Sequence, residues 1–212
     1  MSSDLIKEFI VILPVLLVSL VAHELAHAAV ATAFGDPTPR ATGRMTLNPL
    51  AHLEIFGTLM LVVTFFVSQG SFFFGWAKPV QIDPRYLDRQ YGAQSLVAAA
   101  GPFTNVVLAV ICGLLVQVFQ SSSAFAANAF YTAFMLNMVL AVLNILPVPP
   151  LDGWRVVTGL LPVEVRAATT DRLLPYESYV FIVLFFVLWR FPAVFQAIFV
   201  PPMRAMANLL GI

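Results

Sequence analysis

Charged residues are scarce in this sequence of 212 residues: Asp, Glu, Lys and Arg together make up 10%, whereas 60% of the residues are hydrophobic. A water-soluble domain normally carries about a quarter charged residues. The shortage of charge, with a mean hydropathy of +0.89, excludes an ordinary soluble domain and predicts an integral membrane protein. The formal net charge is zero, so nothing points to nucleic acid or to a strongly acidic partner.

Cysteine is nearly absent as well. The single Cys112 lies in an apolar run, so no disulfide can form within the chain and a packing role is expected. The first apolar run exceeds the length of a signal peptide, and we expect it to be retained. No connection between the apolar runs is long enough for a separate soluble domain. We therefore expect one membrane-embedded domain over residues 1–212, with its core at about 9–161.

Five apolar segments define the expected architecture. Each of the first four is long enough to cross about 30 Å of hydrocarbon at 1.5 Å per residue. The last is either one span plus an interfacial helix or two spans broken near Pro192 and Pro201-Pro202. The segments are 9–34, 55–74, 93–119, 125–146 and 179–189, the last continuing towards 210. The predicted fold class is an all-α integral membrane protein with five or six transmembrane helices.

Two polar connections carry further expectations. Residues 41–47 form either a short β-strand or an ordinary surface loop; as a strand, their exposed edge could hold an unwound substrate segment. The connection 146–178 begins with several prolines, which cannot continue a regular helix and predict extended or re-entrant backbone. Basic residues follow both of the first two spans and leave the membrane orientation undecided.

The first apolar segment carries the sequence HELAH at residues 23–27. Residues four apart share one face of a helix, so His23 and His27 can point their imidazoles at one divalent ion. Glu24 is rotated by about 100° from His23 and can instead reach a water held on the metal, as a general base must. The alternative is a set of polar residues satisfied by hydrogen bonds between helices. Ionisable groups within a bilayer are costly and usually functional, which favours the metal site.

A catalytic zinc site needs a third protein ligand and an open position. Most aspartates lie in polar loops or near the N-terminus, whereas Asp152 follows the proline-rich stretch after an apolar segment. Irregular backbone at membrane depth is tolerated where it lines a wet cavity. A carboxylate presented there suits a metal site, which makes Asp152 the favoured third ligand.

HELAH followed far downstream by NILPVPPLDG (144–153) resembles the site-2 protease family of intramembrane zinc metalloproteases, whose second signature is N-x-x-P-x-P-x-L-D-G. AAAGPFTN (98–105) also resembles the Gly-Pro-x-x-Asn element of that family. The resemblance spans residues 20–155. The chain is similar to short, compact bacterial members, although 55–74 adds an apolar segment, none precedes HELAH, and no PDZ or CBS regulatory domain is recognised.

The resemblance implies that His23, His27 and Asp152 bind one Zn²⁺ and that Glu24 activates the water. It implies that Asn144 positions the substrate peptide or stabilises the oxyanion.

Two further residues have open interpretations. The family places Asn105 near the active site, and the alternative is an interhelical hydrogen bond. His52 is either an interfacial residue that bonds a backbone carbonyl or a lipid headgroup, or it lies near the metal as a reversible gate.

These observations predict an intramembrane zinc endopeptidase that cleaves bonds in or near transmembrane segments. By resemblance, its partners would be single-span membrane proteins such as anti-sigma factors, and its location the bacterial cytoplasmic membrane. The alternative is a membrane metal transporter using the same His, Glu and Asp cluster, and a third possibility is a non-catalytic relative that binds membrane helices. Glu24 discriminates among them, because only a protease should retain zinc and lose all function on Glu24→Gln.

Overall fold

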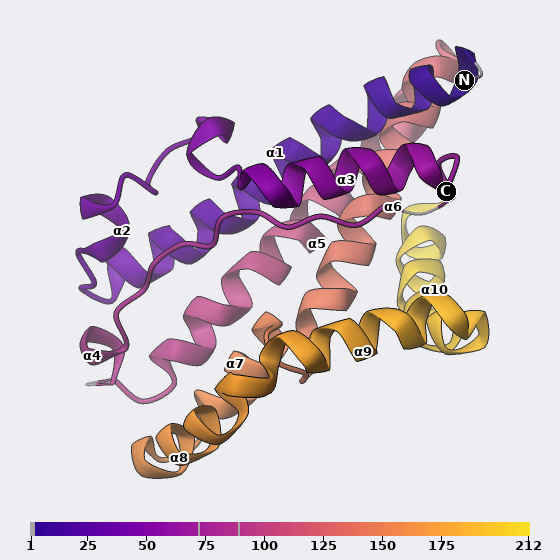
Figure 1. The fold of residues 1–212 in the computed structure, drawn as a ribbon. Helices are drawn as coiled ribbons and strands as arrows, with labels where there is room; N and C mark the ends of the chain where they lie inside the picture. Colours follow the sequence, from indigo (N-terminus) through magenta and orange to yellow (C-terminus); the bar gives the residue numbers. More distant parts are fainter. Residues whose placement is uncertain (1–2, 72, 89) are drawn as a thin grey trace.

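The computed structural model describes residues 3–71, 73–88 and 90–212 and consists of helices joined by short connections (Figure 1). Within these residues no β-sheet forms, and Leu53 and Ala77 make an isolated antiparallel bridge. The helices in chain order are α1 (Ser3–Ala33), α2 (Thr38–Ala41), η1 (Pro49–Ala51), α3 (Ile55–Val67), α4 (Pro84–Leu87), α5 (Ala93–Phe119), α6 (Ala124–Ile145), α7 (Asp152–Thr158), α8 (Val163–Leu173), η2 (Leu174–Tyr176), α9 (Glu177–Arg190) and α10 (Pro192–Leu210).

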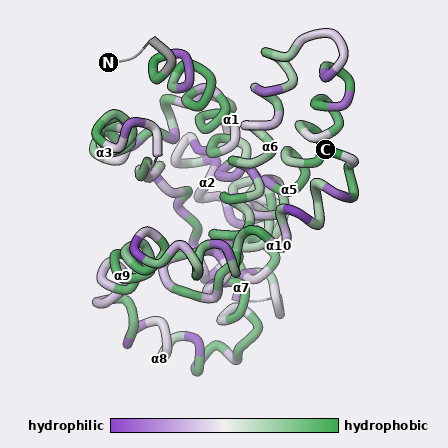
Figure 2. The backbone as a smooth tube through the Cα atoms, turned by 90° about the vertical axis from the view of Figure 1, so that its right-hand side faces the viewer, coloured by the Kyte–Doolittle hydropathy of each residue, from purple (hydrophilic) through white to green (hydrophobic). Residues whose placement is uncertain are grey.

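In the described part of the chain, five helical stretches are long and apolar enough to cross a membrane, which confirms the prediction of a helical multi-pass membrane protein. Figure 2 shows hydrophobic residues over much of the length of the long helices. The five stretches are Leu5–Ala33, Ala93–Phe119, Ala124–Ile145, Val163–Arg190 and Pro192–Leu210.

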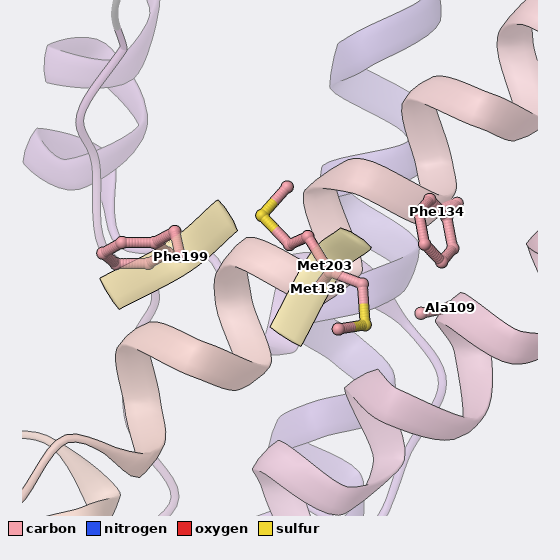
Figure 3. Packing of buried hydrophobic residues seen from close by; sticks show 5 residues of the cluster. All are labelled: Ala109, Phe134, Met138, Phe199 and Met203. Atoms are coloured by element: carbon pink, nitrogen blue, oxygen red, sulfur yellow. The ribbon is translucent and has the colours of Figure 1, made fainter. Parts of the chain in front are cut away.

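Helices α1, α5 and α6 pack against one another and hold the centre of the molecule together. Small residues on α5, including Gly101, Ala109 and Gly113, are buried, and small side chains let membrane helices approach closely. A second set of contacts joins α10 to α5 and α6. Its buried members, shown in Figure 3, are Ala109, Phe134, Met138, Phe199 and Met203.

The predicted span at 55–74 is wrong in its length. Its helix, α3, has 13 residues, or about 20 Å at 1.5 Å per residue, which is too short for the hydrocarbon core. Gln69 and Gly70 take positive φ values of 56° and 79°, and this left-handed backbone cannot continue a helix. Residue 72 lies outside the described residues.

The alternative of a β-strand at 41–47 is wrong. Residues 38–41 form the short helix α2, a turn follows, and Gly43 has a φ of 70°. A proline early in α2 presets helical φ, and a left-handed glycine then reverses the chain. These residues therefore do not offer a strand edge for a substrate.

The proline-rich connection after α6 is irregular, as the sequence predicts. Helix α6 ends at Ile145, and Leu146 is extended with φ −60° and ψ 133° because Pro147 follows it. Whether this stretch is re-entrant stays a prediction. The remainder of 146–178 contains α7, α8 and η2.

The last apolar region divides at Pro192, the first residue of α10. Proline is tolerated at the first position of a helix, because the backbone N–H that it lacks would have no partner within the helix there. Pro201 and Pro202 lie inside α10 and do not end it. Of the two alternatives for this region, the structure supports two separate helical stretches of spanning length, because the first of them, Val163–Arg190, includes α8 and η2 as well as α9.

Candidate metal centre

Three side chains from distant parts of the sequence converge at the centre of the bundle. His23 and His27 lie on α1, and Asp152 is the first residue of α7. The Nε2 atoms of the histidines lie 3.0 and 3.2 Å from Asp152 Oδ2 and 3.1 Å from each other. Ligand atoms around a tetrahedral zinc, with bonds of about 2.1 Å, lie roughly 3.4 Å apart. The three atoms are therefore spaced closely enough for one small metal ion to bind all of them, and we call His23, His27 and Asp152 the candidate metal cluster.

The Nδ1 atoms of both imidazoles make hydrogen bonds to α5. His27 Nδ1 lies 2.7 Å from the carbonyl oxygen of Val97, which can only accept a hydrogen bond. His27 therefore donates through Nδ1–H. In the neutral ring, Nε2 then carries the lone pair that faces His23 and Asp152.

A chain of amide hydrogen bonds determines which atom donates in the contact between His23 and Asn105. Asn137 Nδ2 donates to the carbonyl oxygen of Ala133, and Asn105 Nδ2 donates to Asn137 Oδ1. Asn105 Oδ1 is then free to accept, and it lies 2.5 Å from His23 Nδ1. His23 thus also presents an unprotonated Nε2 in its neutral form. Partners that fix the tautomer in this way are typical of metal-binding histidines.

The cluster therefore brings together three electron-pair donors, each of which can only accept a hydrogen bond. Asp152 Oδ2 is buried and has no hydrogen-bond partner in the described part of the chain, although buried polar atoms are normally paired. A proton on the Nε2 atom of one histidine would form a hydrogen bond with one neighbouring acceptor. The remaining two acceptor atoms of the cluster would still face each other without a proton between them. A divalent cation would satisfy all three atoms at once, so the donor set fits zinc.

One stripe of α5 supports both histidines. Val97, Gly101 and Asn105 are spaced by four residues, so they follow one face of the helix. Gly101 lies between Val97 and Asn105 on this face. Glycine is needed there because a Cβ would overlap the Nε2 atoms of His23 and His27. The Gly-Pro-x-x-Asn element thus supplies a gap for the imidazoles and an acceptor one turn further on.

The Asp-Gly pair positions the third side chain. Helix α7 begins at Asp152, where a carboxylate is favourable near the helix N-terminus. Gly153 follows because a Cβ there would overlap the carbonyl oxygen of Ile145 at the end of α6. The close approach of α7 to α6 brings Asp152 to the histidines of α1.

Glu24 is half-buried and lies outside the cluster. Its Oε2 accepts a hydrogen bond of 2.9 Å from the backbone N–H of Val80. The helix places Glu24 next to His23 but on a different face, as the sequence predicts for a general base.

Asn144 and His52 each make a hydrogen bond to a backbone carbonyl. Asn144, near the end of α6, donates through Nδ2 to the carbonyl oxygen of Leu140. His52 is 1% exposed, and its Nε2 lies 3.0 Å from the carbonyl oxygen of Thr46. His52 does not join the candidate metal group within the described residues, and its bond to a backbone carbonyl matches one of the two alternatives.

Sequence reasoning missed two contributors. Asn137 is 2% exposed and orients Asn105, and a lone amide in an apolar segment is a signal that could have identified it. The N–H of Val80 gives no sequence signal, because every residue except proline carries one.

The fold and the cluster define a helical membrane protein with a His, His and Asp group that could hold a metal ion. A family model described as Peptidase family M50 matches residues 113–188. Two similar proteins are named "Putative zinc metalloprotease": YwhC of Bacillus subtilis and Rip2 of Mycolicibacterium smegmatis. YwhC is 40% identical over 191 residues, covering 82% of each chain. Rip2 is 32% identical over 178 residues, covering 83% of this chain and 65% of Rip2. No solved structure matches the chain.

This chain belongs to peptidase family M50, the site-2 protease family, and is a zinc metalloprotease. The motifs at 23–27 and 144–153 predicted this family from the sequence alone.

Replacing Gly101 with Ala is expected to lower zinc affinity by at least roughly tenfold, because the new Cβ displaces both imidazoles. Alanine is the better helix former by up to about 1 kcal/mol, so weaker helix formation would not explain such a loss. Zinc content after dialysis against graded chelator measures the effect. Gly113→Ala is the matched control, since its Cβ meets the flexible end of Leu210. Equal zinc retention in both variants would contradict the proposed role of Gly101.

Replacing His52 with Ala is expected to leave the zinc content unchanged and to lower stability by about 1–3 kcal/mol, because a buried ring and its hydrogen bond are lost. Metal analysis and thermal unfolding in detergent measure the two effects. A gain of activity or a change in zinc content would instead support the gate hypothesis.

Proposed function

We propose that this chain is an intramembrane endopeptidase that hydrolyses peptide bonds in or near transmembrane segments of membrane proteins. The observation that carries the proposal is the convergence of three acceptor atoms from α1 and α7, with Glu24 beside them on α1. His23, His27 and Asp152 would hold one zinc ion. When bound, zinc supplies a Lewis acid that polarises the scissile carbonyl and makes a water molecule more acidic.

The side chains of the protein have distinct tasks in this reaction. Glu24 takes a proton from the attacking water and later gives it to the leaving amine, as the peptide C–N bond breaks and a C–O bond forms. Asn105 and the carbonyl of Val97 hold the imidazoles in the tautomer that binds metal. Asn144, half-buried near the end of α6, would position the substrate peptide or stabilise the oxyanion.

The proposed substrates are single-span proteins of the bacterial cytoplasmic membrane, with anti-sigma factors as one candidate class. Five helical stretches of spanning length among the described residues support a location within the membrane. A helix hides its amide bonds in the i to i−4 ladder, so the substrate must unwind before hydrolysis. Metal transport is not favoured, because the similar proteins are named as zinc metalloproteases.

The test is cleavage by the purified, zinc-loaded chain in detergent and in liposomes. The probes are a panel of dye-labelled single-span peptides of varied sequence together with labelled casein, which is unstructured. New peptide termini identified by mass spectrometry, and absent with Glu24→Gln, would support the proposal. No cleavage of any probe, together with zinc flux into liposomes, would support transport instead.

A further inference from the structure

An extended segment without helix, residues 76–83, runs between α3 and α4 (Figure 1). We call residues 76–83 the strap. The strap first contacts the two residues that follow η1: Ala77 bridges to Leu53, and the N–H of Lys78 donates to the carbonyl oxygen of His52 at 2.8 Å. At this end the strap is therefore held by backbone groups.

The other end of the strap is held by a buried carboxylate. Asp36, which is 0% exposed, accepts the N–H of Asp83 at 2.8 Å through Oδ2 and the N–H of Thr38 at 2.9 Å through Oδ1. Asp83 in turn caps α4 by accepting from the N–H of Arg85. The Arg85 side chain also hydrogen bonds to Asp83 and lowers the pKa of that carboxyl group, which keeps the cap ionised.

Between these two attachments the strap reaches Glu24. The backbone N–H of Val80 donates to Glu24 Oε2 at 2.9 Å. Val80 is itself buried, with 8% of its surface exposed, so water competes little for its N–H. The other carboxylate oxygen, Oε1, has no hydrogen-bond partner in the described part of the chain.

We propose that the strap positions the catalytic carboxylate: the N–H of Val80 holds Glu24 Oε2, and Oε1 is left to exchange the proton. This inference rests on the proposed function, because it assigns a positioning group to the same site. A glutamate side chain has several rotatable bonds, and restricting them costs conformational entropy. A hydrogen bond that is already formed in the free enzyme offsets this cost before the substrate binds. Small misplacements of a catalytic group lower the rate strongly.

The experiment replaces the amide of Val80 with an ester by incorporating the α-hydroxy analogue of valine into the full chain. The ester keeps the side chain and removes the N–H. The expected result is a roughly tenfold or larger fall in kcat, because a hydrogen bond to a charged group is lost, with KM and zinc content nearly unchanged. The probe is the labelled single-span peptide that the wild-type chain cleaves fastest.

Two controls separate positioning from a general loosening of the strap. The first is the same ester at Gln81, whose N–H has no hydrogen-bond partner among the described residues. The second is Gln81→Ala, which removes most of an exposed side chain of the strap and keeps the N–H of Val80. Both are expected to keep kcat within about twofold of the wild type, since neither removes the bond to Glu24.

The outcomes are distinct. Wild-type kcat in the Val80 ester, or an equal fall in the Gln81 ester, would overturn the inference and leave the protease proposal intact. Loss of zinc or of thermal stability in the Val80 ester would show a structural role and also overturn it. If the wild-type chain cleaves no probe, the proposed function fails, and the inference fails with it.

Discussion

Replacing Glu24 with Gln is expected to lower peptide hydrolysis by about 10²–10⁴-fold, the usual contribution of general acid–base catalysis. The amide cannot take a proton from water, yet it occupies nearly the same space. Its carbonyl oxygen can still accept the N–H of Val80, so the strap should stay in place. Glu24 also lies outside the candidate metal cluster, so the zinc content should match that of the wild type.

The measurement is the rate of appearance of new peptide termini at equal zinc loading. A matched control is Glu164→Gln in the exposed first turn of α8, which removes a carboxylate far along the sequence and should leave the rate unchanged. Substantial hydrolysis by the Glu24→Gln variant would exclude Glu24 as the base. Loss of zinc would show that Glu24 supports metal binding instead.

Replacing Asp152 with Asn is expected to remove zinc binding together with activity. The substitution keeps the size of the side chain, but a neutral amide is a much weaker zinc ligand than a carboxylate. The two histidines would then be the only strong protein ligands of the site. The loss of affinity should exceed the roughly 10–100-fold that removal of a supporting partner costs.

Zinc titration followed by metal analysis measures this effect, and activity should fall in parallel with zinc content. Asp171→Asn, at an exposed position of α8, is the control for a lost carboxylate. Full zinc occupancy in the Asp152 variant would mean that the metal is held by another group, and the proposed ligand set would then be abandoned.

The sequence predicted the parts of the site whose geometry follows from short-range spacing. The four-residue separation of His23 and His27 fixes their common face on any helix. Asp152 was identified because prolines interrupt an apolar segment just before it, and the structure brings its carboxylate to the two imidazoles. The direction of the hydrogen bonds to α5 depends on how three helices pack, and one sequence does not specify that packing.

The errors in the predicted fold have local causes. The apolar segment 55–74 has the composition of a full span, but Gln69 and Gly70 take left-handed backbone and stop α3 early. At 41–47 a short strand was one of the two predicted alternatives, but Pro39 and Gly43 determine a short helix and a turn. In both cases a few backbone angles decide the outcome, and average hydropathy or propensity does not report them.

The stripe of Val97, Gly101 and Asn105 on α5 has a thermodynamic consequence. Because one helix face orients both imidazoles, a rotation of α5 against α1 would release His23 and His27 together. By linkage, an ion that binds only the packed arrangement must stabilise that packing, by an amount that grows with the free ion concentration. Chelation should therefore lower the melting temperature of the helical bundle as well as stop peptide cleavage.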